Sequence, residues 1–186
     1  MKSKKVILRL AKLNGACADE YNEYKNARGK ENYNVLLRYI DVFIDEKILI
    51  ASDIKWLIEH GANVHIHDDL ALFTAVRHGK SNIVKWLIEH GADVNARNAH
   101  ILTVAITNND LKIVKYLVVN GIDLHTLDYD VILTAIDTGN LEMVRWLIAH
   151  GADANVPEYI IRYALIDRRY DIVDFIDKTI NPKLAA

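Results

Sequence analysis

Four glycines that recur at a constant spacing constrain the fold of this chain more than any other feature. They are separated by 30 residues each time: Gly61, Gly91, Gly121 and Gly151. A fixed period of this length is typical of repeat proteins, in which one short structural unit is stacked several times. The sequence therefore predicts a row of similar units that bury their apolar faces against one another.

The segment before each repeat glycine is predicted to form a helix. In the clearest copy, the apolar residues fall at i, i+1, i+4 and i+5, a spacing that places them on one helix face: Ile83, Val84, Leu87 and Ile88. The corresponding segments are 54–60, 113–120 and 143–150. Because glycine readily adopts the left-handed backbone conformation that ends a helix, each of these helices is expected to stop at its glycine.

A shorter helix is predicted before each of these helices. Three segments align at the same period and share an alanine, which lets neighbouring helices approach closely: 70–76, 101–106 and 131–136. The positions between the two helices hold residue types that tolerate positive φ, namely Gly79, Asn109 and Gly139. Each unit is therefore expected to consist of a helix, a tight left-handed turn, a second helix and a loop. One such pair has too little core to fold alone, so the units must stack.

The best-defined unit resembles an ankyrin repeat. Residues 83–95 read Ile-Val-Lys-Trp-Leu-Ile-Glu-His-Gly-Ala-Asp-Val-Asn, which is similar to the second helix and loop of that family. The resemblance covers residues 54–156 and implies an all-α, ankyrin-type repeat solenoid of stacked helix-turn-helix units with short connecting loops. The units are 30 residues long rather than ~33, and Leu70–Phe73 replaces the usual Thr-Pro-Leu-His box.

Shortened units of this kind resemble those that giant viruses of amoebae, such as Mimivirus, encode in large numbers. This resemblance implies a viral protein in the host cytoplasm. An intracellular, cytoplasmic protein is expected in either case, because Cys17 is the single cysteine and cannot form an internal disulfide.

The repeat period divides the chain into an N-terminal segment and a repeat domain. Residues 1–34 are expected to form a helix and a polar capping segment, and residues 35–186 the ankyrin repeat domain. Within that domain we expect a divergent first unit, three regular units and a C-terminal capping unit: 35–66, 67–96, 97–126, 127–156 and 157–186. In the last unit Asp174 and Asp177 replace the usual basic or apolar residues, as the water-exposed end of a solenoid requires.

Composition argues against several classes of function. The formal net charge is -2 and the pI is about 6.4, so no basic field favours nucleic acid or an anionic membrane as a partner. No apolar run approaches the ~20 residues of a membrane span. The chain has no nucleophile elbow, glycine-rich phosphate loop or His-Glu-x-x-His motif, so we expect neither enzymatic activity nor a cofactor.

The resemblance also implies a function and a surface. Ankyrin proteins usually hold their ligand on the concave side, formed by the first helices and the projecting loops. We therefore expect a non-enzymatic protein–protein interaction module or adaptor, host-directed if the chain is viral. The corresponding positions vary from unit to unit: Thr74, Arg77, His78, Val104, Thr107, Asn108, Thr134, Asp137 and Thr138 on the helices, and Arg97, Asn98, His125 and Asp128 on the loops. Such variation is expected of a recognition surface, and equally of an unconstrained one.

An aromatic residue recurs at one position of the second helix, and a cation usually precedes it. This aromatic stripe consists of Trp56, Trp86, Tyr116, Trp146 and Phe175, and the cations are Lys55, Lys85, Lys115 and Arg145. We favour packing between successive second helices, with a solvated face on which Glu59 and Glu89 pair with cations four residues earlier. The alternatives are an exposed ladder for a partner or for stacked bases, and a structural, self-assembling homo-oligomer paired through the stripe or the N-terminal helix.

Three histidines stand immediately before a repeat glycine: His60, His90 and His150. At the C-terminal end of a helix a histidine can interact with free carbonyl groups, so we expect a structural role. A second group, His65, His67 and Asp68, alternates along one loop. A metal would need further ligands from other loops, such as His100 or His125, and we predict no metal site.

Asn95 matches the loop asparagine that asparaginyl hydroxylases modify in some ankyrin proteins. The resemblance makes it a candidate hydroxylation site. A loop asparagine that bonds its own backbone would explain the same residue without any modification.

Overall fold

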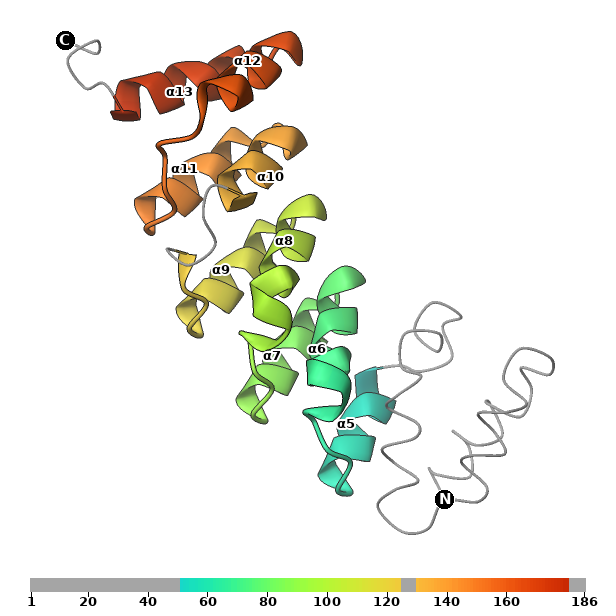
Figure 1. Cartoon of the computed structure of the whole chain (residues 1–186). Helices are drawn as coiled ribbons and strands as arrows, with labels where there is room; N and C mark the ends of the chain where they lie inside the picture. Colours follow the sequence, from blue (N-terminus) through green and yellow to red (C-terminus); the bar gives the residue numbers. More distant parts are fainter. Residues whose placement is uncertain (1–50, 125–129, 181–186) are drawn as a thin grey trace. The chain divides into compact units, whose positions relative to one another are not determined.

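The computed structural model describes residues 51–124 and 130–180, and every regular element in these ranges is a helix (Figure 1). The all-α fold class predicted from the repeat is confirmed. The predicted N-terminal segment 1–34 and the first half of the divergent unit, residues 35–50, lie outside the described residues.

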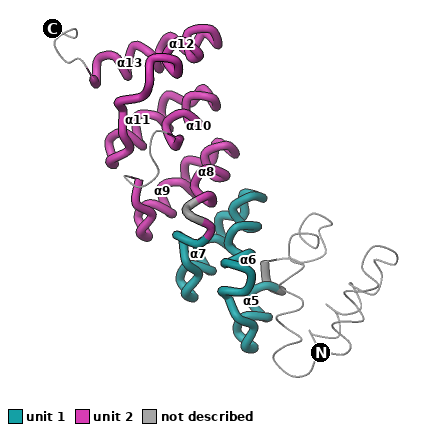
Figure 2. The backbone as a smooth tube through the Cα atoms, viewed as in Figure 1, with its two compact units in different colours: residues 1–96 teal, residues 97–186 magenta. Residues whose placement is uncertain are grey.

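The chain divides into two compact units, residues 1–96 and residues 97–186 (Figure 2). The described helices of unit 1 are α5 (Ala51–Glu59), α6 (Ile66–Arg77) and α7 (Ser81–Glu89). A short 3-10 helix, η1 (Ala96–Ala99), follows in sequence. Unit 2 contains α8 (His100–Thr107), α9 (Leu111–Val119), α10 (Asp130–Thr138), α11 (Leu141–Ala149), α12 (Glu158–Ile166) and α13 (Tyr170–Ile180).

Within each of the two compact units, the helix pairs of successive repeats stack in the predicted order. In unit 1, α7 packs against both α6 and α5. In unit 2, each first helix packs against its own second helix, α8 and α12 both contact α10, and α11 contacts α13 (Figure 1). The first helices of unit 2 therefore form one layer and the second helices another.

Repeated apolar positions supply the core. The second helices bury the same three positions in each copy: Ile83, Val84 and Leu87; Ile113, Val114 and Leu117; Met143, Val144 and Leu147; and Ile172, Val173 and Ile176. The shared alanines Ala75, Ala105 and Ala135 have no exposed surface, which agrees with the close helix approach predicted for them. Burial of such a stripe is the main force that stabilises a short helix of this kind.

Left-handed residues close the turns between paired helices. Gly79, Asn109 and Gly139 have φ of 61°, 56° and 69°, as predicted. In the C-terminal repeat, between α12 and α13, Arg168 adopts this conformation with φ of 60°. The second helix ends as expected: in α7, the N–H of Gly91 donates to the carbonyl of Ile88 and that of Ala92 to Leu87, both at 3.0 Å. This pair of bonds satisfies carbonyl groups that the helix leaves open.

The first turn of α6 departs from a regular helix. His67, Asp68 and Asp69 have φ of 52° to 54° and left-handed ψ values, and the regular helix begins after them. Three successive non-glycine residues in this region are unfavourable by ~1–2 kcal/mol each. Asp69 is the buried residue among the three, and the hydrogen bonds of its side chain act against this cost.

Candidate interaction surface

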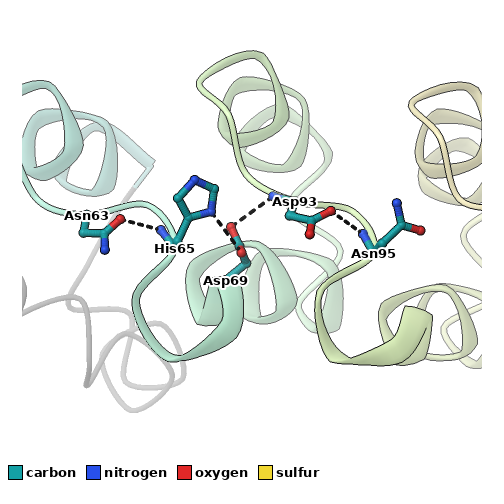
Figure 3. Close-up of polar contacts among 5 residues, drawn as sticks. All are labelled: Asn63, His65, Asp69, Asp93 and Asn95. Atoms are coloured by element: carbon teal, nitrogen blue, oxygen red, sulfur yellow. Dashed lines mark hydrogen bonds and ion pairs between the residues drawn. The ribbon is translucent and has the colours of Figure 1, made fainter.

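A buried carboxylate holds two successive loops together in unit 1 (Figure 3). Asp69 is only 5% exposed. Its Oδ1 accepts the backbone N–H of Asp93 at 3.1 Å, and its Oδ2 lies 3.2 Å from Nδ1 of His65. A buried carboxylate with two hydrogen-bonded partners fixes its surroundings more firmly than an exposed one does. The loop before α6 is therefore fixed to the loop that follows α7.

The loops are also braced by short-range bonds. The N–H of Asn95 donates to Oδ1 of Asp93 at 2.8 Å, and the N–H of Asn155 donates to Asp153 in the same way at 2.8 Å. In the first copy the N–H of His65 donates to the amide oxygen of Asn63 at 3.0 Å. In each of these bonds the side chain two residues earlier makes the turn. The expected bond from the Asn95 side chain to its own backbone stays a prediction. Asn95 is exposed.

The predicted first-helix residues differ in accessibility. Arg77, Thr107, Asn108 and Asp137 are exposed, and His78, Val104, Thr134 and Thr138 are half-buried, as is the loop residue Arg97. Thr74 has no exposed surface, so its assignment to the accessible surface is wrong. It lies one helical turn after the buried Ala71 and shares its core-facing side. The side chain of Asn98 and the whole of His125 and Asp128 lie outside the described residues.

Several hydroxyl groups on this surface bond to their own helix. Thr107 donates to the carbonyl of Thr103 at 2.9 Å, Thr134 to Asp130 at 2.8 Å, and Thr138 to Ala135 at 2.7 Å. Because their single protons are used, these threonines present a methyl group and an acceptor to a ligand. The surface is therefore less polar than its composition suggests.

On the second-helix side, the histidines before the repeat glycines cap their own helices. Nδ1 of His60, His90 and His150 lies 2.7 to 2.8 Å from the carbonyl oxygen of the tryptophan four residues earlier. A carbonyl only accepts, so Nδ1 carries the proton. Each imidazole also stacks on that indole, with ring centroids 3.7 to 4.0 Å apart. The amide of Asn120 donates to Tyr116 at 2.7 Å and replaces the histidine. The expected structural role is confirmed.

Cations connect the aromatic stripe from one repeat to the next. Nζ of Lys55 lies 5.4 Å from the ring centroid of Trp86, and Nζ of Lys115 lies 5.9 Å from that of Trp146. In unit 2 the guanidinium of Arg145 lies 4.3 Å from the ring of Phe175. Two ion pairs accompany them, each with Nζ 3.9 Å from Oε1: Lys85–Glu89 lies within one helix, and Lys115–Glu142 joins two repeats. These contacts support the packing interpretation of the stripe, whose rings are half-buried.

In the described ranges, no group of three or more His, Cys, Asp or Glu side chains is arranged to hold a metal ion. Of the residues considered for a metal site, His65 directs Nδ1 at Asp69 instead. No helix in the part of the chain that the structure describes is long and apolar enough to cross a membrane.

Two overlapping segments of the chain, residues 48–128 and 102–184, match the family model described as ankyrin repeats in three copies. The chain belongs to the ankyrin-repeat family. The ankyrin-type helical repeat fold expected from residues 83–95 is thereby confirmed. No curated protein matches the chain closely enough to count as a relative. The similarity to the repeats of giant viruses stays a prediction.

This ankyrin chain also carries a feature that the sequence patterns did not single out. A pocket of about 430 Å³ lies between α10 and α12 in the first-helix layer of unit 2. Its lining consists of Leu133, Asp137, Tyr159, Ile160, Arg162, Tyr163 and Ile166. The capping unit was expected to be polar, and this holds for α13, where Asp174 and Asp177 are exposed. It does not hold for α12, where Tyr159, Tyr163 and Ile166 are 58%, 48% and 77% exposed.

A sequence signal for this pocket did exist. Tyr159, Tyr163 and Ile166 are spaced i, i+4 and i+7, which makes a second apolar stripe beside the core stripe of Ile160 and Ala164. A helix with two apolar faces can bury only one of them against its own repeat.

Proposed function

We propose that this ankyrin protein binds another protein, without catalysis, on the surface formed by its first helices and loops. Ankyrin repeats typically serve as non-enzymatic modules that bind other proteins. The observation that supports this surface is the contrast, within each compact unit, between the first and the second helices. Lysines of the second helices lie against the aromatic ring of the next repeat, whereas the exposed first-helix residues differ from repeat to repeat.

The bracing of the loops supports the same proposal. Because Asp69 and Asp93 hold the loops of unit 1 in place before any ligand arrives, little conformational entropy is lost on binding. A rigid surface also favours recognition by shape. If the chain is viral, as its short repeats suggest, the partner is a host protein and the chain acts as an adaptor.

The test is an affinity capture with two matched triple variants. The surface variant carries Arg77→Glu, Asn108→Arg and Asp137→Arg on first-helix positions. The control variant carries Lys112→Glu, Asn82→Arg and Asp177→Arg, which make the same kinds of charge change at exposed positions of second helices. Equal thermal melts for all three proteins establish that folding is unchanged. A protein captured by the wild type and the control, and lost by the surface variant, is the expected result.

The reverse pattern would contradict the proposal. If the control variant loses the captured protein and the surface variant keeps it, the second helices form the binding surface. Self-association is the second candidate function, and the exposed apolar side chains of α12 are the observation that favours it. Sedimentation of the purified chain over a range of concentrations distinguishes it, since a monomer at all concentrations excludes a homo-oligomer.

A further inference from the structure

We infer that the groove between α10 and α12 binds a peptide segment of the partner, and that this segment inserts an apolar side chain with a lysine or arginine close to it. The inference rests on the proposed function, because it places one anchoring site on the first-helix surface. It goes beyond that function by specifying the chemistry of the ligand. The groove, named here the α10–α12 groove, is lined by the seven residues given above.

The walls of the groove are suited to an apolar anchor. Ile160 is fully buried and Leu133 is half-buried, while Tyr159, Tyr163 and Ile166 project from one face of α12 with 48% or more of their surface exposed. A volume of about 430 Å³ lies within the usual range for ligand pockets, which begins at ~300 Å³. Monomeric proteins rarely leave such apolar groups together in water unless they contact something. Tyrosines are also among the residues that contribute most to binding at protein interfaces.

The charges around the groove select a basic neighbour. Arg162 is neutralised by Glu158, whose Oε1 accepts from its Nε at 3.1 Å and its Nη2 at 2.8 Å. The carboxylate of Asp137 is exposed and forms no ion pair with a described side chain; only its backbone carbonyl is used, by Arg169 at 3.3 Å.

The net charge of the whole first-helix layer of unit 2 is also negative. Apart from the Glu158–Arg162 pair, helices α8, α10 and α12 carry the carboxylates Asp130 and Asp137 and no Lys or Arg; the guanidinium of Arg169, from the turn after α12, reaches the backbone carbonyl of Asp137. A cationic residue beside the anchor would meet Asp137 at the rim, and rim charges mainly set specificity and association rate.

The same charges argue against a second copy of this chain as the occupant. A symmetric dimer through the α10–α12 groove would bring this face against itself. Asp137 of both copies would then enter one interface, in which Arg162 is already paired with Glu158, and an excess of one charge sign across an interface is unfavourable. An external segment with an apolar and a basic residue avoids that repulsion.

The experiment is a selection of random dodecapeptides displayed on phage against the full chain, followed by fluorescence anisotropy with the selected peptides. Enriched peptides are expected to share an aliphatic or aromatic residue with Lys or Arg within a few positions. Ile166→Ser and Tyr163→Ala should each raise the Kd by about tenfold or more, as loss of an anchor contact does. Asp137→Asn should raise it by about threefold and weaken its dependence on salt. Tyr170→Ala, an exposed tyrosine of α13 outside the groove, should change it by less than about twofold.

The outcomes separate this inference from the function on which it rests. Peptides that bind equally well to the groove variants but lose binding to Asn108→Arg on the α8 side would overturn the groove and leave the first-helix surface standing. Peptides whose Kd is raised only by the control changes Asn82→Arg and Lys112→Glu would overturn both the groove and the first-helix surface. An acidic consensus, no enrichment at all, or self-association that Tyr163→Ala abolishes would each overturn the peptide ligand.

Discussion

The guanidinium of Arg169 lies where a β-carbon on Gly139 would be, and its Nη2 donates to the carbonyl of Asp137 at 3.3 Å. Arg169 thus reaches back from the capping unit to the turn of the preceding repeat. At the equivalent turn of unit 1, a β-carbon on Gly79 would meet nothing within 4 Å. The two glycines therefore differ in surroundings although their φ values, 61° and 69°, are alike.

Alanine at these two positions is expected to destabilise the protein unequally. Gly79→Ala should lower the free energy of unfolding by about 1 kcal/mol, because a side chain is strained at positive φ. Gly139→Ala should lower it further, because Arg169 must also move. Urea denaturation measures both. In an Arg169→Ala background the excess at Gly139 should vanish, and an excess that persists would show that the contact does not cause it.

The Asp69 network predicts a second stability difference. Asp69→Ala leaves the N–H of Asp93 and the ring of His65 without their carboxylate, so the free energy of unfolding should fall by about 2 kcal/mol. Asp68→Ala is the matched control, because Asp68 has nearly the same left-handed φ of 53° but is exposed. Its effect should be at most about half as large. Equal losses in urea denaturation would mean that the buried carboxylate of Asp69 contributes no more than the exposed one of Asp68, and would contradict the role of this network.

The fold was predictable because the 30-residue period repeats every requirement of the core. Positions such as Ala105 and Leu117 are buried by their own repeat and its neighbours, so the pattern within the sequence decides their environment. The left-handed turn at Gly79 was predictable for a similar reason, since its chemistry is local.

The surface was less predictable, because exposure depends on what lies beside a residue. Thr74 is fully buried, whereas Thr134, which occupies the corresponding place in its repeat, is half-buried. In the same way, the apolar spacing of Tyr159 and Tyr163 is typical of a buried helix face, and only the arrangement of α10 and α12 reveals a groove. Asp69 was missed because its partner Asp93 is 24 residues away in the sequence.

The histidine caps give a third prediction. One repeat already carries asparagine, Asn120, at the position of these histidines. His90→Asn should retain the hydrogen bond to the carbonyl of Trp86, as Asn120 does with Tyr116, and lose only the ring contact. His90→Ala removes both, so it should lower the free energy of unfolding by about 1 kcal/mol and the asparagine variant by less. Urea denaturation of both variants provides the comparison. An asparagine variant as unstable as the alanine variant would assign the stabilisation to stacking alone.

Arg168 gives the last prediction, and here the change should stabilise the protein. It has φ of 60° at a turn position where the earlier repeats have glycine or asparagine. Removing its β-carbon relieves the steric cost of the left-handed conformation, so Arg168→Gly should raise the free energy of unfolding by about 0.5–1 kcal/mol. Asp167→Gly is the control: its φ is -79°, which any residue adopts, so glycine there only adds freedom to the unfolded chain and should destabilise. Thermal melts of the two single variants give opposite shifts if backbone strain at Arg168 is the cause. Shifts of the same sign would show that the side chain of Arg168 contributes more than its conformation costs.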